Sequence, residues 1–444
     1  ADNSNLNITT KGGAANKIPA PSSRNVYTYI GSNRPNSFTS LSSHLFSTNN
    51  TAITDNLLGT NTSCDTSTTT ANPCRATLIN FIRGDGDGNL STTTDTRHIM
   101  GDAVHSQPAV VIYGNSSCTP SSTNDCEIEN LNDAVVFVAT NDGFLHAIRP
   151  YSTTDSSNGE ELWSFIPQEI IPDLLNVYRD NPLSSFNAKH YSLDGDIRVL
   201  KYDINSDGKV DTSAGDRVFI YFSQGRGGDN YYALDVTDKT NPKFMWSLDR
   251  SNNSPNNLPA VSKSWSTPTL GRVNISGATQ NPQKLVLIFG GGYDDDEDSI
   301  DFRSSDSYGN AIYMVDAVKG TVLWSQTKTS SGAFARMTHA IPSNITVLDT
   351  DNNGYSDRMY VGDMAGQLWR FDITNGNTVA TLVTGGVIGS LGAKEITNGS
   401  ETTLRKNNRT FYNAPDVSMM TSTSGSNYYN IAIGSGDRAR PKSN

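Results

Sequence analysis

The residues most able to do chemistry lie in the stretch LDTDNNGYSDRMYVGDMAGQLWRFD, residues 348–372. Its first part places oxygen-bearing residues at alternating positions of a loop and Gly354 at the sixth position. A calcium loop of the EF-hand type has this order: side-chain oxygens at positions 1, 3 and 5, a sharp turn at glycine, a backbone carbonyl at 7 and another oxygen at 9. The predicted calcium ligands are Asp349, Asp351, Asn353, Tyr355 through its carbonyl, and Asp357.

This loop departs from an EF-hand at its end. The twelfth position is Tyr360 rather than glutamate, and the apolar pattern that follows predicts a strand rather than a helix. Hard oxygen ligands on a flexible loop suit Ca2+ better than Mg2+, which demands stricter octahedral geometry. The alternative interpretation is a solvated turn stabilised by its own aspartate and asparagine side chains.

A second stretch, DINSDGKVD, repeats the pattern with Gly208 at the sixth position and Ala214 at the twelfth. A lysine at the seventh position is compatible with calcium because only its backbone carbonyl is needed. Both loops precede an apolar strand, expected at 217–222 and at 358–361. A plain polar turn is again the alternative. The predicted ligands of this second calcium loop are Asp203, Asn205, Asp207, Lys209 through its carbonyl, and Asp211.

A third acidic stretch, RGDGDGNLS, contains the tripeptide Arg83-Gly84-Asp85. Integrin ligands use this tripeptide when it lies at an exposed loop tip, so it is a candidate receptor motif, although it also arises by chance. A metal loop here would use Asp85, Asp87 and Asn89, but leucine and threonine occupy its sixth and ninth positions. The pattern therefore favours a turn over a metal site.

No catalytic constellation can be assembled from the sequence. The six histidines are scattered, and neither a G-x-S-x-G elbow nor an H-E-x-x-H motif occurs. His146 lies inside an expected strand, GFLHAI, where a packed structural histidine is the favoured interpretation. We therefore predict no catalytic residues and no enzymatic activity.

The four cysteines fall in two close pairs, Cys64 with Cys74 and Cys118 with Cys126. Each pair brackets a polar stretch, which favours two disulfides formed in an oxidising compartment and hence an exported protein. Zinc is the alternative, but its sites use tighter spacing and no histidine cluster lies nearby.

The composition limits the partners. A formal net charge of −11 supplies no basic stripe that could follow phosphates, which argues against nucleic acid as the main partner. No apolar run approaches the roughly 18 residues of a membrane-spanning helix. The first residues, ADNSNLNITTKGG, lack a basic start and an apolar stretch, so a signal peptide is expected to be absent or already removed.

The elements that must position these loops form a repeat. Each copy reads as an apolar strand, a glycine-containing turn, a strand ending near aspartate, a polar turn and a strand with an aromatic residue. Three copies reach a tryptophan, namely Trp163, Trp246 and Trp324. The copies begin at Asp133, Asp216, Gln283 and Asp357, with a degraded fifth at Tyr428.

One such unit cannot bury both faces of its apolar strand, so several must stack, and arranging them in a ring removes exposed edges. The copies lie about 70 residues apart, so they are either every second blade or blades with long insertions. We predict an all-β, modified β-propeller over 98–444, with one amphipathic helix at 167–180. Residues 1–97 are expected to be a polar, irregular N-terminal arm or the remnant of a preceding region.

From about residue 98 to 441, the chain resembles the C-terminal domain of the type IV pilus PilC/PilY family. The resemblance rests on MGDAVHSQPAVVIYG, VVFVATNDGFLHAI, GRGGDNYYALDVTDKTNP and the stretch at 348–372, in that order. It implies a seven-bladed propeller of the quinoprotein-like type, and its calcium loop matches the residues predicted at 349–357. Members of this family carry a large N-terminal region and continue past GSGDRARP, so a C-terminal fragment is expected.

The resemblance also implies a function. Family members are secreted proteins at the cell surface, the pilus tip or the outer membrane, and they contact the pilus tip or minor pilins. They promote pilus assembly by opposing retraction, and they support twitching motility and adhesion to surfaces or to a host-cell receptor. The alternative is a quinone-cofactor-dependent dehydrogenase on the same scaffold, since fold alone does not decide function. A generic propeller binding module outside pili is a third interpretation.

Overall fold

The computed structural model describes residues 13–60, 73–85, 100–114, 133–150, 159–179, 190–251, 257–298, 305–392 and 409–436. The chain divides into two compact units. The first comprises Ala1–Phe222 and Ala233–Met245, and the second comprises Ser223–Tyr232 and Trp246–Asn444.

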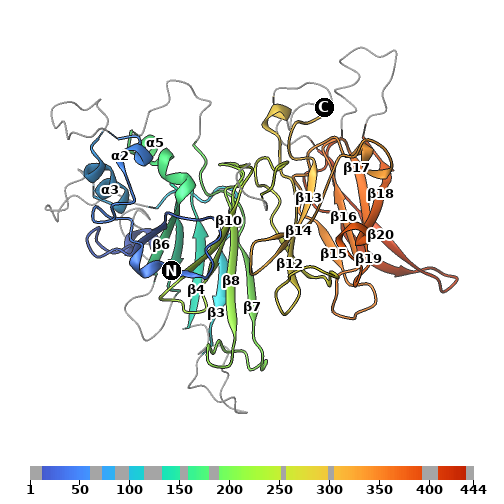
Figure 1. Ribbon diagram of the computed structural model, residues 1–444, viewed down its shortest axis with the longest axis horizontal. Helices are drawn as coiled ribbons and strands as arrows, with labels where there is room; N and C mark the ends of the chain where they lie inside the picture. Colours follow the sequence, from blue (N-terminus) through green and yellow to red (C-terminus); the bar gives the residue numbers. More distant parts are fainter. Residues whose placement is uncertain are drawn as a thin grey trace, which may run out of the picture. The chain divides into compact units, whose positions relative to one another are not determined.

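Two five-stranded sheets come first along the chain (Figure 1). The first sheet has the order β1-β6-β5-β4-β3, and all its neighbours are antiparallel except β1 and β6, which run parallel. Its strands are β1 (Val26–Tyr29), β3 (Ala109–Ile112), β4 (Ala134–Ala139), β5 (Leu145–Ile148) and β6 (Glu161–Pro167). The second sheet has the order β2-β10-β9-β8-β7, with β2 (Thr39–Ser40), β7 (Arg198–Tyr202), β8 (Arg217–Ser223), β9 (Tyr231–Asp235) and β10 (Lys243–Leu248).

Two four-stranded antiparallel sheets and a hairpin follow in the second unit (Figure 1). The third sheet contains β11 (Thr269–Arg272), β12 (Leu285–Gly290), β13 (Ala311–Asp316) and β14 (Val322–Thr327) in sequential order. The fourth contains β15 (Thr346–Leu348), β16 (Arg358–Gly362), β17 (Gln367–Ile373) and β18 (Val383–Ser390), also in sequential order. The hairpin consists of β19 (Asp416–Thr421) and β20 (Asn427–Ala432).

Helices are few and short. The predicted helix at 167–180 is confirmed as the 3-10 turn η3 (Gln168–Asp173) followed by α5 (Leu174–Arg179), and Pro172 lies in the 3-10 part. The others are α2 (Asp55–Leu58), α3 (Arg75–Arg83) and the 3-10 turns η1 (Ala14–Lys17), η2 (Leu41–Ser43), η4 (Asp295–Asp298), η5 (Ala333–Arg336) and η6 (Val379–Thr381). None of the helices in the described residues is long and apolar enough to cross a membrane.

The repeat is confirmed, and each of the first four copies supplies three neighbouring strands of one sheet. Successive copies begin in β4, β8, β12, β16 and β20, so in the described residues the spacing reflects long insertions within and between blades rather than skipped blades. Strands such as β9 and β13 are buried at every position, which explains their nearly continuous apolar sequence. Seven blades were expected, but the described residues contain four sheets of four or five strands and one hairpin.

The prediction of an irregular segment over residues 1–97 is wrong for the parts that the structure describes. β1 pairs with β6, with Val26 opposite Ser164, and β2 pairs with β10. α3 buries Leu78, Ile79 and Ile82 completely. Strands of four and two residues are too short to show a period, so the polar composition of this region concealed them.

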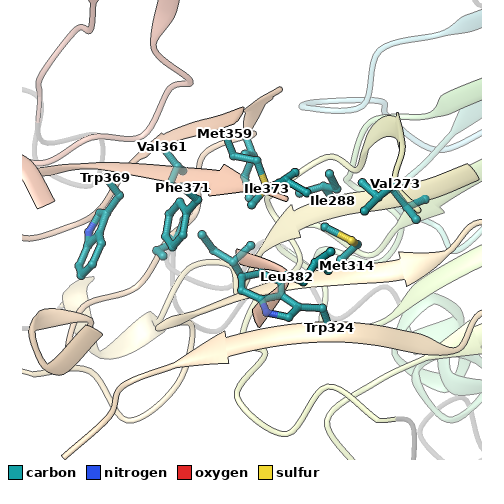
Figure 2. Close-up of a cluster of buried hydrophobic side chains, with 14 of the residues drawn as sticks. Val273, Ile288, Met314, Trp324, Met359, Val361, Trp369, Phe371, Ile373 and Leu382 are labelled. Carbon is teal, nitrogen blue, oxygen red and sulfur yellow. The ribbon is translucent and has the colours of Figure 1, made fainter. Parts of the chain in front are cut away.

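The third and fourth sheets share a hydrophobic core (Figure 2). It is built from alternate residues of facing strands, which point to the same side of each sheet. The repeat tryptophan Trp324 and Trp369 of β17 both belong to it. Its fully buried members include Val286, Ile288, Ile312, Met314, Met359, Val361, Phe371 and Leu382.

The repeat tryptophans also connect one copy to the next through their indole N–H groups. Trp163 in β6 donates to the Lys239 carbonyl, 76 residues later, over 2.8 Å. Trp246 in β10 donates to the Ala317 carbonyl, 71 residues later, over 3.4 Å. Because a buried indole N–H needs an acceptor, each bond fixes the tryptophan against the turn that precedes the last strand of the next copy.

Candidate metal centre

The first predicted loop, residues 349–357, connects two paired strand residues, Leu348 in β15 and Arg358 in β16. It brings ligand atoms of Asp349, Asp351 and Asp357 within 4.8 Å of one another. The first two side chains are exposed and Asp357 is half-buried. Among the described residues, no other group of three or more acidic, histidine or cysteine side chains has its ligand atoms this close together.

The backbone of the loop turns its N–H groups towards these carboxylates. Asn352 and Gly354 have positive φ angles of 60° and 86°, which reverse the chain at the middle of the loop. The Gly354 N–H donates to Asp349 Oδ2 over 2.7 Å, and the Tyr355 N–H donates to Asn353 Oδ1 over 2.8 Å. A side chain at position 354 would need the same left-handed conformation, which favours glycine there.

The hydrogen bonds also keep the first carboxylate ionised. Loss of hydration would raise the pKa of Asp349, but N–H donors from Gly354 and Asn353 outweigh it and lower that pKa. Three carboxylates so close together repel one another, and a cation between them relieves this repulsion. With an amide oxygen from Asn353 and a carbonyl from Tyr355 in the same loop, the donor set consists of oxygen atoms and fits a hard divalent cation.

The second predicted loop has the same turn. Ser206 and Gly208 have φ angles of 57° and 81°, and the Gly208 N–H donates to Asp203 Oδ2 over 2.8 Å. The ninth residue, however, turns away. Asp211 Oδ1 accepts both the N–H and the hydroxyl of Ser213 at 2.7 Å, and these bonds lower the pKa of Asp211. The Lys201 ammonium donates to the Gly208 carbonyl over 2.6 Å, which places a positive charge beside this loop.

The structural counterpart of Asp357 in this second loop is Asp216, not Asp211. Asp216 directly precedes the paired residue Arg217 in β8, as Asp357 directly precedes Arg358 in β16. Asp216 Oδ1 accepts the N–H of the loop's second residue, Ile204, over 3.0 Å. In the first loop, Asp357 Oδ2 accepts the N–H of Thr350 in the same way over 2.7 Å.

The placement of Asp211 as the ninth ligand of the second loop is therefore wrong. Residues 211–215 form an insertion before the strand, so counting from Asp203 reached the wrong aspartate. Counting back from the start of the apolar strand would have found Asp216. Within the described residues, the acidic side chains of this loop do not form a group of three within 4.8 Å.

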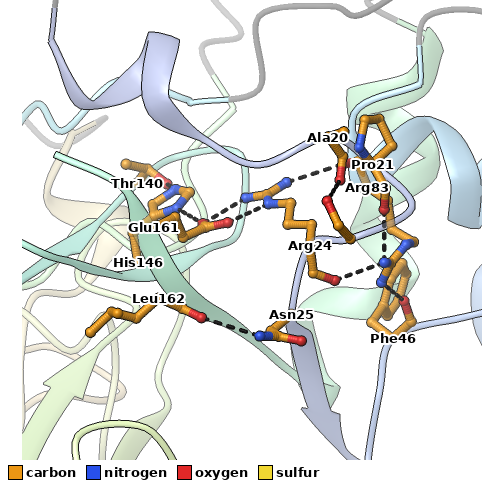
Figure 3. Close-up of polar contacts among 11 residues, drawn as sticks. Ala20, Pro21, Arg24, Asn25, Phe46, Arg83, Thr140, His146, Glu161 and Leu162 are labelled. Atoms are coloured by element: carbon orange, nitrogen blue, oxygen red, sulfur yellow. Dashed lines mark hydrogen bonds and ion pairs between the residues drawn. The ribbon is translucent and has the colours of Figure 1, made fainter. Parts of the chain in front are cut away.

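The candidate receptor motif is not an exposed loop tip. Arg83 is 6% exposed and Asp85 is 2% exposed. Gly84 ends α3 in a left-handed conformation, and the Arg83 guanidinium donates to the carbonyls of Phe46 and Arg24 over 3.0 and 2.7 Å (Figure 3). The tripeptide is buried because distant segments cover it, so the prediction of a receptor motif here is wrong.

His146 is confirmed as a structural histidine (Figure 3). It is fully buried in β5, and its Nδ1 lies 2.6 Å from Glu161 Oε1. Arg24, which precedes β1, donates to the same carboxylate, with Nη2 2.8 Å from Oε1. This buried group of three ionisable side chains joins the N-terminal segment to β5 and β6.

Several predicted residues lie outside the described residues, namely Cys64, Cys118, Cys126, Asp87 and Asn89. Cys74 is described, and it directly precedes α3 as its N-terminal cap residue. The two disulfide pairings therefore stay predictions.

The fold and the loop together define a β-propeller-type protein with a strand-flanked, EF-hand-like acidic loop. Residues 100–382 match the family model described as the PilY1 beta-propeller domain, and the chain belongs to this family. The matched segment contains both predicted calcium loops and the four larger sheets except for β1, β2 and β18.

The relatives are named as pilus proteins. The chain is 28% identical over 322 residues to the "Type IV pilus biogenesis factor PilY1 homolog" of Xylella fastidiosa, covering 70% of this chain and 22% of the relative. It is 28% identical over 314 residues to the "Type IV pilus biogenesis factor PilY1" of Pseudomonas aeruginosa strain UCBPP-PA14, covering 68% and 23%. The chain thus spans about a fifth of the length of these curated relatives.

A solved structure is also similar. The crystal structure of the Pseudomonas aeruginosa PilY1 C-terminal domain aligns with a TM-score of 0.43 and 20% identity, covering 70% of this chain and 54% of that one.

Proposed function

We propose that this chain is the calcium-binding part of an exported, type IV pilus-associated protein and has no enzymatic role. The observation that carries the calcium proposal is the convergence of Asp349, Asp351 and Asp357 within 4.8 Å. Calcium in this loop would neutralise the three carboxylates. Backbone hydrogen bonds already orient two of these carboxylates. The N–H groups of Gly354 and Asn353 donate to Asp349, and the Thr350 N–H donates to Asp357.

The pilus proposal rests on family membership and on the printed names of the relatives. We propose that the protein promotes pilus assembly by opposing retraction, supports twitching motility and adhesion, and acts at the pilus tip, the cell surface or the outer membrane. Its partners would be minor pilins or the pilus tip, and a host-cell receptor would be bound through a surface other than the buried Arg83-Gly84-Asp85 segment. Two disulfides, Cys64–Cys74 and Cys118–Cys126, would suit this oxidising location.

Calcium titration by calorimetry tests the site. The wild-type chain is expected to bind one calcium ion in the loop 349–357. Asp357→Ala is expected to weaken this binding more than about 100-fold, because loss of an outer partner alone costs about 10- to 100-fold. Asp211→Ala is the matched control from the second loop, and it is expected to leave the isotherm unchanged. Wild-type binding that survives Asp357→Ala would contradict the assignment of the site.

Piliation of the bacterium that makes this chain tests the function. A chromosomal Asp357→Ala variant is expected to change the number of surface pili and the twitching zone, whereas Asp211→Ala is expected to match the parent strain. Equal piliation of all three strains would contradict a role of the calcium loop in the pilus. The quinone-dependent dehydrogenase is tested separately, since it requires the purified chain to acquire quinone absorbance and dye reduction when the cofactor is added.

A further inference from the structure

We propose that the loop 349–357 is a latch between the third and fourth sheets, and that Ser356 is the residue that joins calcium binding to this contact. The inference rests on the proposed calcium function and adds a positioning residue that supplies no ligand. Ser356 is the eighth residue of the loop, between the carbonyl ligand Tyr355 and the carboxylate ligand Asp357. It is 6% exposed, although the first half of the loop is exposed.

Ser356 contacts the edge strand of the neighbouring sheet. Its N–H donates to the Arg272 carbonyl in β11 over 2.8 Å, and its hydroxyl accepts the Arg272 N–H over 3.4 Å. One residue of the loop thus satisfies both backbone groups of one residue in β11. A neutral hydrogen bond of this kind contributes about 1 kcal/mol, and leaving a buried partner unsatisfied costs more.

Asn375, in the turn after β17, completes the contact. Its Nδ2 donates to the Ser356 carbonyl over 3.0 Å, and its Oδ1 accepts the Asn274 N–H over 2.9 Å. The Gly376 N–H also donates to the Asn274 carbonyl over 2.8 Å. The second half of the loop is therefore held between β11 of the third sheet and the β17–β18 turn of the fourth.

Gly271 in β11 shows how closely the two sheets approach at the loop. A Cβ atom added at this residue would lie 2.8 Å from Ser356 Oγ, while its next neighbours, Ile288 and Val286, would be at ordinary contact distances of 3.5 and 3.6 Å. The Ser356 hydroxyl is therefore the group that a side chain at position 271 would clash with. Gly271 itself can supply no side-chain oxygen to a cation.

Linkage connects these observations. The carboxylates of Asp349 and Asp351 belong to the exposed half of the loop. Asp357 follows Ser356, and its backbone is hydrogen-bonded to the backbone of Leu348 and Ile373. Binding requires the exposed half to stay in the position next to Asp357 that it has in this structure, so any contact that fixes Ser356 lowers the ordering cost of binding. By reciprocity, occupation of the loop strengthens the contact between the two sheets by the same factor.

Calcium titration of Ser356→Ala, Gly271→Ala and the double variant tests the latch. Each single variant is expected to weaken calcium binding about fivefold, as expected for one lost hydrogen bond. The double variant is expected to bind calcium about as well as Ser356→Ala alone, because the new methyl group then occupies the space left by the hydroxyl. Ser325→Ala, at an exposed serine of β14, is the matched control and is expected to bind as the wild type does.

Hydrogen exchange of the wild type gives a readout that needs no substitution. Calcium is expected to slow hydrogen exchange at the Ser356 and Gly376 amides. The Ser356 N–H donates to the Arg272 carbonyl in β11, and the Gly376 N–H donates to the Asn274 carbonyl. Asn375→Asp, which keeps the acceptor for Asn274 and loses the donor to Ser356, serves if Ser356→Ala does not fold.

The outcomes separate the two hypotheses. Wild-type affinity in Gly271→Ala together with unchanged exchange at Ser356 and Gly376 would overturn the latch and leave a local calcium site. A wild-type chain that binds no calcium would overturn the proposed calcium function and the latch with it. Strictly additive losses in the double variant would also overturn the latch, because the two residues would then act independently.

Discussion

Glu161→Leu is expected to lower the free energy of unfolding of the first unit by about 3–5 kcal/mol. The carboxylate of Glu161 is the common partner of Arg24 and His146, and all three side chains are buried. Removing it leaves the Arg24 guanidinium without its counter-charge in a site that water does not reach. Urea unfolding followed by the fluorescence of the chain, with each transition fitted separately, measures this change.

A double variant is the matched control. Arg24→Met combined with Glu161→Leu removes both charges and keeps similar volumes, so it is expected to be more stable than Glu161→Leu alone. Because breaking a buried pair costs more than replacing it, the recovery identifies unpaired charge as the cause. A double variant less stable than the single one would contradict this explanation.

The same group predicts a pH dependence. Burial alone would raise the pKa of Glu161, but the charge and hydrogen bonds of Arg24, with a contribution from His146, lower it to about 2. A carboxyl group with a lowered pKa in the folded state stabilises above its unfolded pKa, near 4.5, and this contribution is lost as the pH falls towards 2. It amounts to roughly 3 kcal/mol. Unfolding midpoints of the wild type should therefore fall between pH 4.5 and 2 more steeply than those of Arg24→Met/Glu161→Leu.

Gly320→Ala is expected to destabilise the second unit by about 3 kcal/mol. Gly320 lies in the turn between β13 and β14 with a φ of +65°, and an added Cβ would lie 2.5 Å from Cγ of the Trp246 ring. The methyl group must therefore push aside a fully buried indole that is hydrogen-bonded to Ala317, in addition to straining the backbone. Thermal unfolding of the variant, followed by near-ultraviolet circular dichroism, measures the loss.

Gly277→Ala is the control for this substitution. Gly277 has a similar φ of +76°, but an added Cβ would meet no atom within 4 Å. It therefore reports the backbone strain alone, which costs about 1–2 kcal/mol. If the two variants lose equal stability, the contact with Trp246 contributes nothing and the explanation fails.

The sequence predicted those features whose residues are close together along the chain. The loop 349–357 could be recognised because its five ligand positions and its glycine fall within nine residues. The apolar strands were also recognisable, because burial on both faces requires nearly continuous apolar residues. The helix at 167–180 was found from its period, although its first half forms a 3-10 turn around Pro172.

Features that depend on distant partners could not be predicted. Arg83 is buried against the backbone of residues 37 and 59 positions earlier, and no local pattern reports that. The acceptors of Trp163 and Trp246 lie 76 and 71 residues away. In the second loop, the insertion 211–215 separates Asp216 from the ninth position, and the pairing of Tyr202 with Arg217 shows this directly.

The parallel pairing of β1 with β6 bears on the order in which the chain can fold. Arg24 and its partner Glu161 are 137 residues apart, so the first sheet cannot close until β6 has been synthesised. Contacts between such distant residues carry a large loop-closure entropy and slow folding. A chain that emerges amino end first must therefore leave one edge of β1, the edge that pairs with β6, without its partner while β3, β4 and β5 assemble. In a chain that crosses a membrane before folding, this open edge of β1 would be the natural place for a chaperone to bind.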